Sequence, residues 1–247
     1  MEFDRDKLTT AGYGVISEFL APREVDTTLR LTRGLGGGRP GTRRLIDVPW
    51  CAELARYITR DEQIRAVLPE SAVAVQCTLF VKSPSRNWLL ALHQDLSIPV
   101  AERIEAAQCL GWSDKEGEIF VQPPAEVLDQ VLAVRLHLDD CDEHNGALRV
   151  VPGSHRFGRL SADDARKARE LSGEVSVAVP RGGVMLMRPL LLHASSKCSS
   201  ERPRRVLHFV FGPMRIPHGL RWRYPHFSEL TENGQGYREG NFSPSGI

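Results

Sequence analysis

The sequence predicts an α+β fold with a mainly β core that is supported by N-terminal helices. Segments before residue 70 have the three- and four-residue apolar spacing of helices, whereas short apolar and β-branched runs follow them. Turns rich in glycine and proline separate these runs. The chain has 247 residues, 41% hydrophobic and 26% charged, which suits one globular domain. We expect helical support and a loop in 1–70, the β core in 71–215, and a C-terminal tail in 216–247.

The N-terminal part is expected to begin with a short strand over 12–20. A helix should follow from Pro22, because proline suits the first helical turn and Glu24 faces the positive end of the helix dipole. The segment 33–44 is a loop by composition, and its arginines make it either a solvated charged loop or a lid over a site. Two further helices are predicted over 49–59 and 61–68.

The β core is predicted to contain a series of short strands, each rich in apolar and β-branched residues. They lie over 73–81, 89–93, 131–139, 147–151, 174–179, 184–192 and 204–211. Strands of this length, separated by turns such as His144-Asn145-Gly146, usually form a β-sandwich or a barrel.

Charge and cysteine usage limit the partners of the chain. Its 32 Lys and Arg against 31 Asp and Glu give a formal charge of +1, so composition does not support nucleic-acid binding. No apolar run reaches the roughly 18 residues that a membrane span needs, and the polar start does not resemble a signal peptide. The five cysteines contain no C-x-x-C pair, which favours reduced thiols. We expect a cytoplasmic protein, monomeric or homodimeric.

A candidate metal site comes from two histidines and one aspartate. His93 and Asp95 are two residues apart at a strand end, so both side chains project from one face. His193, at the end of another apolar run, would supply a second imidazole. Two histidines and one carboxylate form the facial triad that binds Fe(II) and leaves adjacent positions open. The H-x-D spacing alone is a weak signal, because single histidines are more often structural.

An arginine after the second histidine strengthens the metal hypothesis. Arg204 opens a strand 11 residues after His193. A guanidinium near an iron site can bind the distal carboxylate of a dicarboxylate in a bidentate, charge-assisted pair. The alternative is a solvated arginine on an edge strand, which fits the neighbouring Arg205 better.

Four motifs in order resemble the phytanoyl-CoA dioxygenase family of Fe(II)/2-oxoglutarate-dependent oxygenases. The similarity runs from residue 11 to about residue 212. The motifs are His93-Gln94-Asp95, the run Asn145-Gly146-Ala147-Leu148-Arg149-Val150-Val151-Pro152-Gly153-Ser154-His155, the run Arg188-Pro189-Leu190-Leu191-Leu192-His193-Ala194-Ser195, and Arg202-Pro203-Arg204-Arg205. One departure is Gly182-Gly183, where the family often has Gly-Asp; it affects a turn only.

The resemblance implies a double-stranded β-helix, which is a cupin-like jelly-roll, with iron at its open end. It implies that His93, Asp95 and His193 bind Fe(II) and that Arg204 binds the C5 carboxylate of 2-oxoglutarate. The expected reaction uses O2 and releases succinate and CO2. The resemblance also suggests cosubstrate or substrate contacts for three further residues, Gln76, Lys82 and Arg135.

Three residues are weaker candidates for a substrate pocket. His137 and His208 alternate in phase with Arg135 and Arg204, so each could point to the same interior or be a buried structural histidine. Trp112 follows the H-x-D turn in a region that often covers the site in the family, although a packing role is equally compatible.

The function predicted from the sequence is hydroxylation of a small-molecule substrate. Asp95 argues against halogenation, because halogenating relatives have a small residue at that position. Desaturation, cyclisation and epimerisation share the triad and stay open. A non-catalytic jelly-roll module that binds a small ligand is the alternative from another class, and a cupin-like isomerase that uses no 2-oxoglutarate is the third. The sequence does not identify the substrate.

Overall fold

The computed structural model describes residues 3–35 and 41–223, and the rest of the predicted tail and of the 33–44 loop lies outside the described residues. Short helices cluster in the N-terminal part and recur between strands. They are α1 (Arg5–Ala11), α2 (Pro22–Leu31), the 3-10 helix η1 (Leu45–Asp47), α3 (Pro49–Arg60), α4 (Glu62–Arg65), α5 (Ala125–Leu128), the 3-10 helix η2 (Ser154–Phe157) and α6 (Ala162–Ser172). None of the helices in this part of the chain is long and apolar enough to cross a membrane.

The strands form three antiparallel sheets. The six-stranded sheet has the order β1 (Tyr13–Ile16), β11 (Val184–Met187), β8 (Leu132–His137), β13 (Arg204–Pro213), β3 (Ala72–Lys82) and β2 (Gly41–Thr42). The four-stranded sheet has the order β10 (Val175–Val177), β9 (Leu148–Val150), β12 (His193–Ser195) and β4 (Leu90–His93). A small sheet contains β5 (Ile98–Val100), β7 (Glu118–Gln122) and β6 (Leu110–Lys115).

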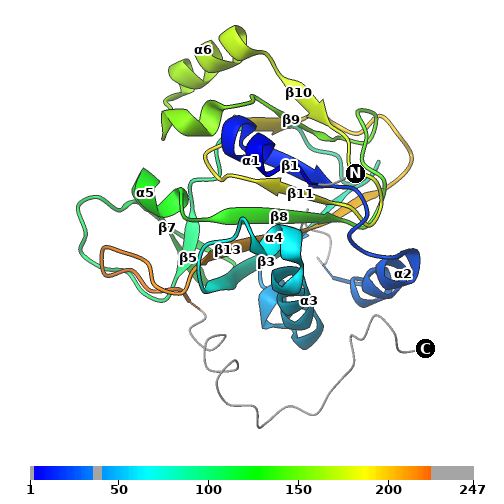
Figure 1. Cartoon of the computed structure of the whole chain (residues 1–247), viewed down its shortest axis with the longest axis horizontal. Helices are drawn as coiled ribbons and strands as arrows, with labels where there is room; N and C mark the ends of the chain where they lie inside the picture. Colours follow the sequence, from blue (N-terminus) through cyan, green and yellow to red (C-terminus); the bar gives the residue numbers. More distant parts are fainter. Residues whose placement is uncertain (1–2, 36–40, 224–247) are drawn as a thin grey trace.

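The two larger sheets pack face to face as a jelly-roll, and N-terminal helices cover the other side of the six-stranded sheet (Figure 1). On that helix side, Leu54 and Ile58 of α3 pack against Leu79, Leu207 and Phe209 in one buried apolar cluster. Because side chains alternate along a strand, the residues between these apolar ones point to the interior between the sheets. The interior side of the sheet therefore carries the polar residues of β3, β8 and β13.

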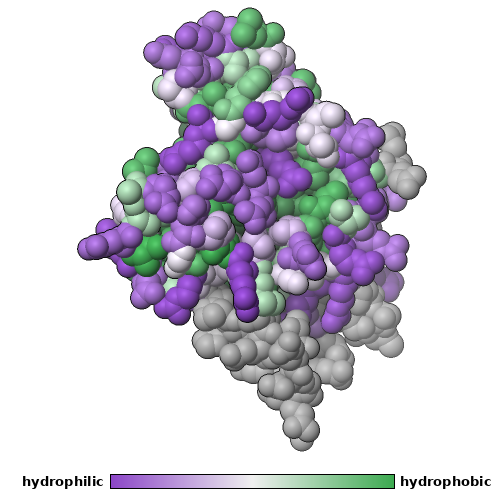
Figure 2. Space-filling model, turned by 60° about the vertical axis from the view of Figure 1, so that its left-hand side comes forward, coloured by the Kyte–Doolittle hydropathy of each residue, from purple (hydrophilic) through white to green (hydrophobic). Residues whose placement is uncertain are grey.

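Apolar side chains from both larger sheets fill part of the interior between them. Tyr13, Met185 and Met187 of the six-stranded sheet pack there with Leu148 and Val150 of the opposite sheet. Hydrophilic residues cover most of the outer face that Figure 2 shows, with small hydrophobic areas between them.

The α+β prediction with a jelly-roll core is confirmed, and most predicted elements occur with shifted ends. The predicted strand over 184–192 is wrong in its second half, because Pro189 ends it and His193 instead begins a new strand. The strand over 12–20 is shorter than predicted, and helix α1 precedes it. The small sheet and α6 were missing from the prediction.

The small sheet contains a tight hairpin that matters for the site. Its β6–β7 turn places Glu116 and Gly117 at positive φ, 57° and 78°, as a two-residue hairpin turn requires. Glu116 also accepts hydrogen bonds from the backbone N–H and the guanidinium of Arg43, both at 3.0 Å. The hairpin therefore fixes the end of the 33–44 loop next to the interior.

Candidate functional site

The three predicted metal ligands come together where β4 and β12 of the four-stranded sheet pair. His93 ends β4 and lies directly opposite His193 of β12 in the sheet register. Asp95 follows two residues later, where its backbone N–H donates to the carbonyl of Pro189 at 2.9 Å. Asp95 Oδ1 lies 3.5 Å from His93 Nε2, and its Oδ2 lies 3.8 Å from His193 Nε2. One ligand atom from each residue lies within 4.8 Å of the other two.

Backbone carbonyls fix the orientation of both imidazoles. His93 Nδ1 donates to the carbonyl of Ala91 at 2.8 Å, and His193 Nδ1 donates to the carbonyl of Leu191 at 3.0 Å. A carbonyl oxygen only accepts, so each Nδ1 carries the hydrogen and each Nε2 keeps its lone pair. Both Nε2 lone pairs are therefore available beside the Asp95 carboxylate, as a divalent cation requires.

The charge states of the triad suit metal binding. Burial alone would raise the pKa of Asp95, but His193 and His93 together hold that pKa well below its usual range. Burial lowers the pKa of His193 to about 4, so its imidazole is neutral near pH 7. Burial alone would lower the pKa of His93, but its hydrogen bond to Asp95 raises that pKa, so a cation at Nε2 would replace the proton there. Two imidazoles and a carboxylate form the donor set of a facial triad, and this set fits Fe(II) or a similar first-row cation.

Gln94 locks the turn between the two H-x-D ligands. Its side-chain amide donates to the carbonyls of Leu190 and Gly158 at 2.7 and 2.8 Å, and its Oε1 accepts from the N–H of Leu160 at 2.9 Å. Both donors and the acceptor of this buried side chain are thus used within the protein. Gln94 therefore fixes the backbone between His93 and Asp95.

Three buried cations lie on the interior side of the six-stranded sheet. Lys82, Arg135 and Arg204 are 0%, 5% and 3% exposed. Lys82 and Arg204 are direct partners in the β3–β13 register, and Arg135 is paired with His208 across β8 and β13. Like charges placed directly opposite in a sheet are destabilising. In the described part of the chain, none of the three cations has an ion pair with a carboxylate.

The buried cations are only partly satisfied by hydrogen bonds. Lys82 Nζ donates to Ser195 Oγ at 2.9 Å and to the Ser196 carbonyl at 2.6 Å, and Arg204 Nη1 donates to the Gly146 carbonyl at 2.5 Å. The Nε atoms of Arg135 and Arg204 are buried without a partner among the described residues. Burial, followed by repulsion from Arg204, lowers the pKa of Lys82 to about 8 and that of Arg135 to about 10. An anion between these groups would accept hydrogen bonds from the unpartnered Nε atoms and would offset the repulsion between the buried positive charges.

Gly146 allows the backbone to approach this cluster closely. Its φ of +84° favours glycine, and a Cβ there would lie 2.9 Å from Lys82 Nζ. The preceding Asn145 holds the turn, since its Oδ1 accepts from the N–H of Asp142 at 2.8 Å. This explains why the Asn145-Gly146 motif accompanies the site although neither residue is a metal ligand.

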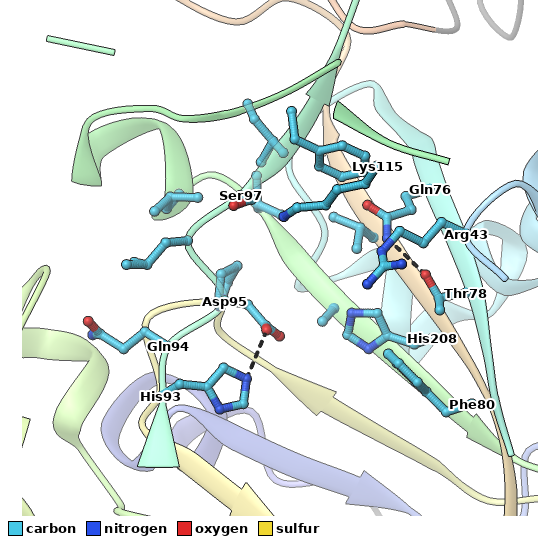
Figure 3. Close-up of a pocket in the computed structure, with 18 residues that line it drawn as sticks. Arg43, Gln76, Thr78, Phe80, His93, Gln94, Asp95, Ser97, Lys115 and His208 are labelled. Atoms are coloured by element: carbon cyan, nitrogen blue, oxygen red, sulfur yellow. Dashed lines mark hydrogen bonds and ion pairs between the residues drawn. The ribbon is translucent and has the colours of Figure 1, made fainter. Parts of the chain in front are cut away.

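A cavity of about 330 Å³ lies next to the triad and contains His93, Asp95 and His208 in its wall (Figure 3). Gln76 and Thr78 of β3 also line it, and the Gln76 amide donates to Thr78 Oγ1 at 2.8 Å. Apolar residues complete much of the wall. They are Phe80, Leu96, Ile98, Phe120, Leu128, Val131, Ala133, Pro189 and Val210.

The remaining sequence candidates occupy different places. His137 is buried, and neither of its ring nitrogens has a hydrogen-bond partner among the described residues. Trp112 packs with the apolar cluster around the small sheet and does not line the cavity. His208 Nδ1 accepts a hydrogen bond from the guanidinium of Arg135 at 3.0 Å. Roles for these three residues in substrate binding stay predictions.

Two cavity residues were not singled out from the sequence. Lys115 comes from the β6–β7 hairpin, and Arg43 was considered only as one of several arginines in the 33–44 loop. Neither lies in a motif with a mechanism, because a single cation in a polar segment gives no pattern. Lys115 reaches the cavity through the small sheet, and Arg43 reaches it through the pairing of β2 with β3.

The fold agrees with solved structures that the comparison found at low identity. EctD from S. alaskensis, in its apoform, has a TM-score of 0.64 at 17% identity over 85% of this chain and 75% of its own. HygX from Streptomyces hygroscopicus, with nickel and 2-oxoglutarate bound, has a TM-score of 0.58 at 19% identity, and the match covers 86% of this chain and 88% of HygX. SnoK, described as a non-heme alpha ketoglutarate dependent carbocyclase from nogalamycin biosynthesis, has a TM-score of 0.61 at 16% identity over 91% and 88%.

The sequence itself matches one family model. A search of curated proteins found no match. The model for phytanoyl-CoA dioxygenase matches residues 8–206, which include both histidines, the aspartate and the arginine of the predicted site. The chain therefore belongs to the phytanoyl-CoA dioxygenase family and is an enzyme of the Fe(II)/2-oxoglutarate oxygenase class.

Proposed function

We propose that this protein binds Fe(II) through His93, Asp95 and His193, uses 2-oxoglutarate and O2, and hydroxylates a small molecule. The single observation that carries the proposal is the pairing of a metal-type triad with buried cations that lack a carboxylate partner in the described structure. Iron accounts for the triad, and a dicarboxylate cosubstrate accounts for the cations. A binding module without chemistry needs no such combination.

Each residue has a defined task in this proposal. The two Nε2 atoms and the Asp95 carboxylate hold the metal, and the backbone carbonyls at their Nδ1 atoms keep the imidazoles in place. Bound iron(II) supplies oxygen activation, which is coupled to the oxidative decarboxylation of 2-oxoglutarate to succinate and CO2. Arg204 binds the distal carboxylate of the cosubstrate through its unpaired Nε and its outer nitrogens.

Lys82 and Arg135 support this cosubstrate site electrostatically. Lys82 is held by Ser195 and Ser196, so its ammonium stays beside Arg204 without being neutralised. Arg135 is held by His208 and by the ring of Phe80, whose centroid lies 5.6 Å from the guanidinium carbon. We assign all three cations to recognition of the cosubstrate dianion, with Arg204 as the direct contact.

The ligand set and the cavity support hydroxylation as the proposed reaction outcome. Asp95 fills the third protein ligand position, which favours oxygen transfer over halogenation. The related carbocyclase fold means that ring closure is the second candidate outcome. We favour hydroxylation, because it needs only that the substrate C–H bond lies near the metal in the apolar part of the cavity.

An anaerobic optical titration tests the proposal. The full-chain protein is loaded with Fe(II) and titrated with 2-oxoglutarate, with glutarate as the matched control that lacks the keto oxygen. We expect a visible charge-transfer band with 2-oxoglutarate only, because chelation needs the keto group beside the 1-carboxylate. Iron-loaded protein without this band would contradict the proposal.

A further inference from the structure

Lys115 brings an additional positive charge into the cavity that contains the triad. It ends β6, and its side chain points into the same cavity as His93 and Asp95 (Figure 3). Its ammonium lies 4.8 Å from the centroid of the Phe120 ring. Among the described residues, no carboxylate forms an ion pair with Lys115 and no group accepts a hydrogen bond from it. The neighbouring Arg43 also lines the cavity, but it is neutralised by Glu116 at 3.0 Å.

Contacts of the β6–β7 hairpin with neighbouring segments fix the position of Lys115. The Glu116-Gly117 hairpin turn follows it directly, and Glu116 is tied to Arg43 as described above. After the turn, the 1% exposed Glu118 pairs with Arg44 at 3.3 Å and with Arg223. These contacts hold the hairpin against the six-stranded sheet, so Lys115 is presented to the cavity by a rigid element.

The charges around Lys115 leave it without a permanent partner. Burial lowers its pKa, Arg43 lowers it further, and only Asp95 across the cavity raises it. Asp95 is committed to the proposed metal. The proposed 2-oxoglutarate site uses Lys82, Arg135 and Arg204, so binding of iron and cosubstrate leaves the ammonium of Lys115 without a counter-charge in the cavity. A negative charge on a third component would be attracted to this side of the cavity.

We propose that the primary substrate is a small molecule with an apolar body and one carboxylate or phosphate group, which Lys115 binds. This inference rests on the proposed function, because it assigns the substrate of that same site. Leu96, Ile98, Leu128 and Val131 would contact the apolar body. The cavity volume of about 330 Å³ lies near the lower limit for ligand pockets, which favours a compact substrate over a long acyl chain. Lys115 is thus a specificity-determining residue.

Ligand-observed NMR on the full-chain protein tests this assignment without knowledge of the natural substrate. The protein is loaded with Ni(II) and saturating 2-oxoglutarate, so that the probes do not compete for the cosubstrate site. Benzoate is compared with benzamide, and hexanoate with hexanamide. Because a charge-assisted hydrogen bond is lost in the amide, we expect each acid to bind about tenfold more tightly than its amide.

Substitutions at two lysines test whether the preference for acids over amides depends on Lys115. Lys115→Met should abolish the preference for the acids, and Lys115→Arg should restore it. Lys167→Met is the matched control, because Lys167 lies on α6 outside the cavity and pairs with Asp164 at 3.7 Å. Equal binding of acids and amides by the unmodified protein would overturn the inference even if a variant failed to fold. So would an unchanged preference in Lys115→Met, or no binding of either acid.

The optical titration separates this inference from the proposed function. A normal charge-transfer band without any preference for acids would remove only the role of Lys115. A Lys115-dependent preference without the band would keep the anion site and remove the oxygenase assignment.

Discussion

Strands β3, β8 and β13 present two sides with opposite chemistry. On the helix side, Leu79, Leu136 and Phe209 are buried against the N-terminal helices in one apolar cluster. On the interior side, Lys82, Arg135 and Arg204 are equally buried but lack carboxylate partners in the described structure. Burial of apolar groups stabilises the fold, whereas burial of unpaired charge costs stability. We therefore expect the helix side to contribute more to stability, and the buried cations of the interior side to suit an anionic ligand.

The largest expected effect is on the interior side, at the triad. His193→Ala removes one of the two imidazoles from the proposed metal site, so succinate formation from 2-oxoglutarate should fall to the level of metal-free protein. His144→Ala is the matched control, since His144 is exposed and lies outside the cavity. A coupled succinate assay measures both variants. Retained turnover in His193→Ala would remove it from the ligand set.

The next effect is on the helix side and concerns stability. Phe209→Ala empties a fully buried position, so the free energy of unfolding should fall by about 3–5 kcal/mol. Phe157→Ala should change it by less than about 0.5 kcal/mol, because Phe157 is 62% exposed. Chemical denaturation measures both. Similar losses in the two variants would show that the apolar cluster is not the main source of stability.

Arg204→Met sharpens the contrast, because it should act on binding and not on stability. Loss of the charge-assisted contact should weaken 2-oxoglutarate binding by about 10- to 100-fold. The ligand-free protein should be no less stable, since a buried cation with an unpaired Nε is removed. Arg205→Met is the control, because Arg205 is paired with Asp139 at 2.6 and 2.8 Å. Weaker cosubstrate binding in Arg205→Met alone would move the role by one residue.

The smallest effect is a pH dependence of the interior side. Burial, followed by repulsion from Arg135, lowers the pKa of His208 to about 3, whereas an unfolded histidine has a pKa of about 6.5. The unfolded chain therefore binds more protons as the pH falls below about 6.5, and stability decreases in that direction by up to about 1.4 kcal/mol per pH unit for this residue. His208→Gln should flatten the dependence of unfolding free energy on pH between 6.5 and 5. An identical slope in both proteins would show that His208 is not buried as a neutral group.

Strand alternation explains how much of the site could be predicted from the sequence. His93 and Asp95 share a face because they are two residues apart, and Arg135, His137, Arg204 and His208 follow the same rule on their strands. The family motifs then indicated which of these residues meet. In the structure, Leu136 and Phe209 are one residue out of phase with Arg135 and His208 and lie in the apolar cluster on the helix side.

The rest of the site depends on features that local patterns do not encode. Lys115 reaches the cavity only because the small sheet packs there, and its short strands contain charged residues and glycines that hide the β pattern. Helix α6 buries only Ala165 and Ala168, so it has too few large apolar residues for a visible helical spacing. The predicted strand over 184–192 joined two apolar runs across Arg188-Pro189, although a proline at this position already argues against one continuous strand.

Crystallography of the anaerobic complex with Fe(II) and 2-oxoglutarate tests the central claim most directly. Anomalous diffraction at the iron edge should give one strong peak within bonding distance of His93 Nε2, Asp95 and His193 Nε2. The distal carboxylate of 2-oxoglutarate should contact Arg204. Iron bound elsewhere, or a cosubstrate carboxylate away from Lys82, Arg135 and Arg204, would contradict the account.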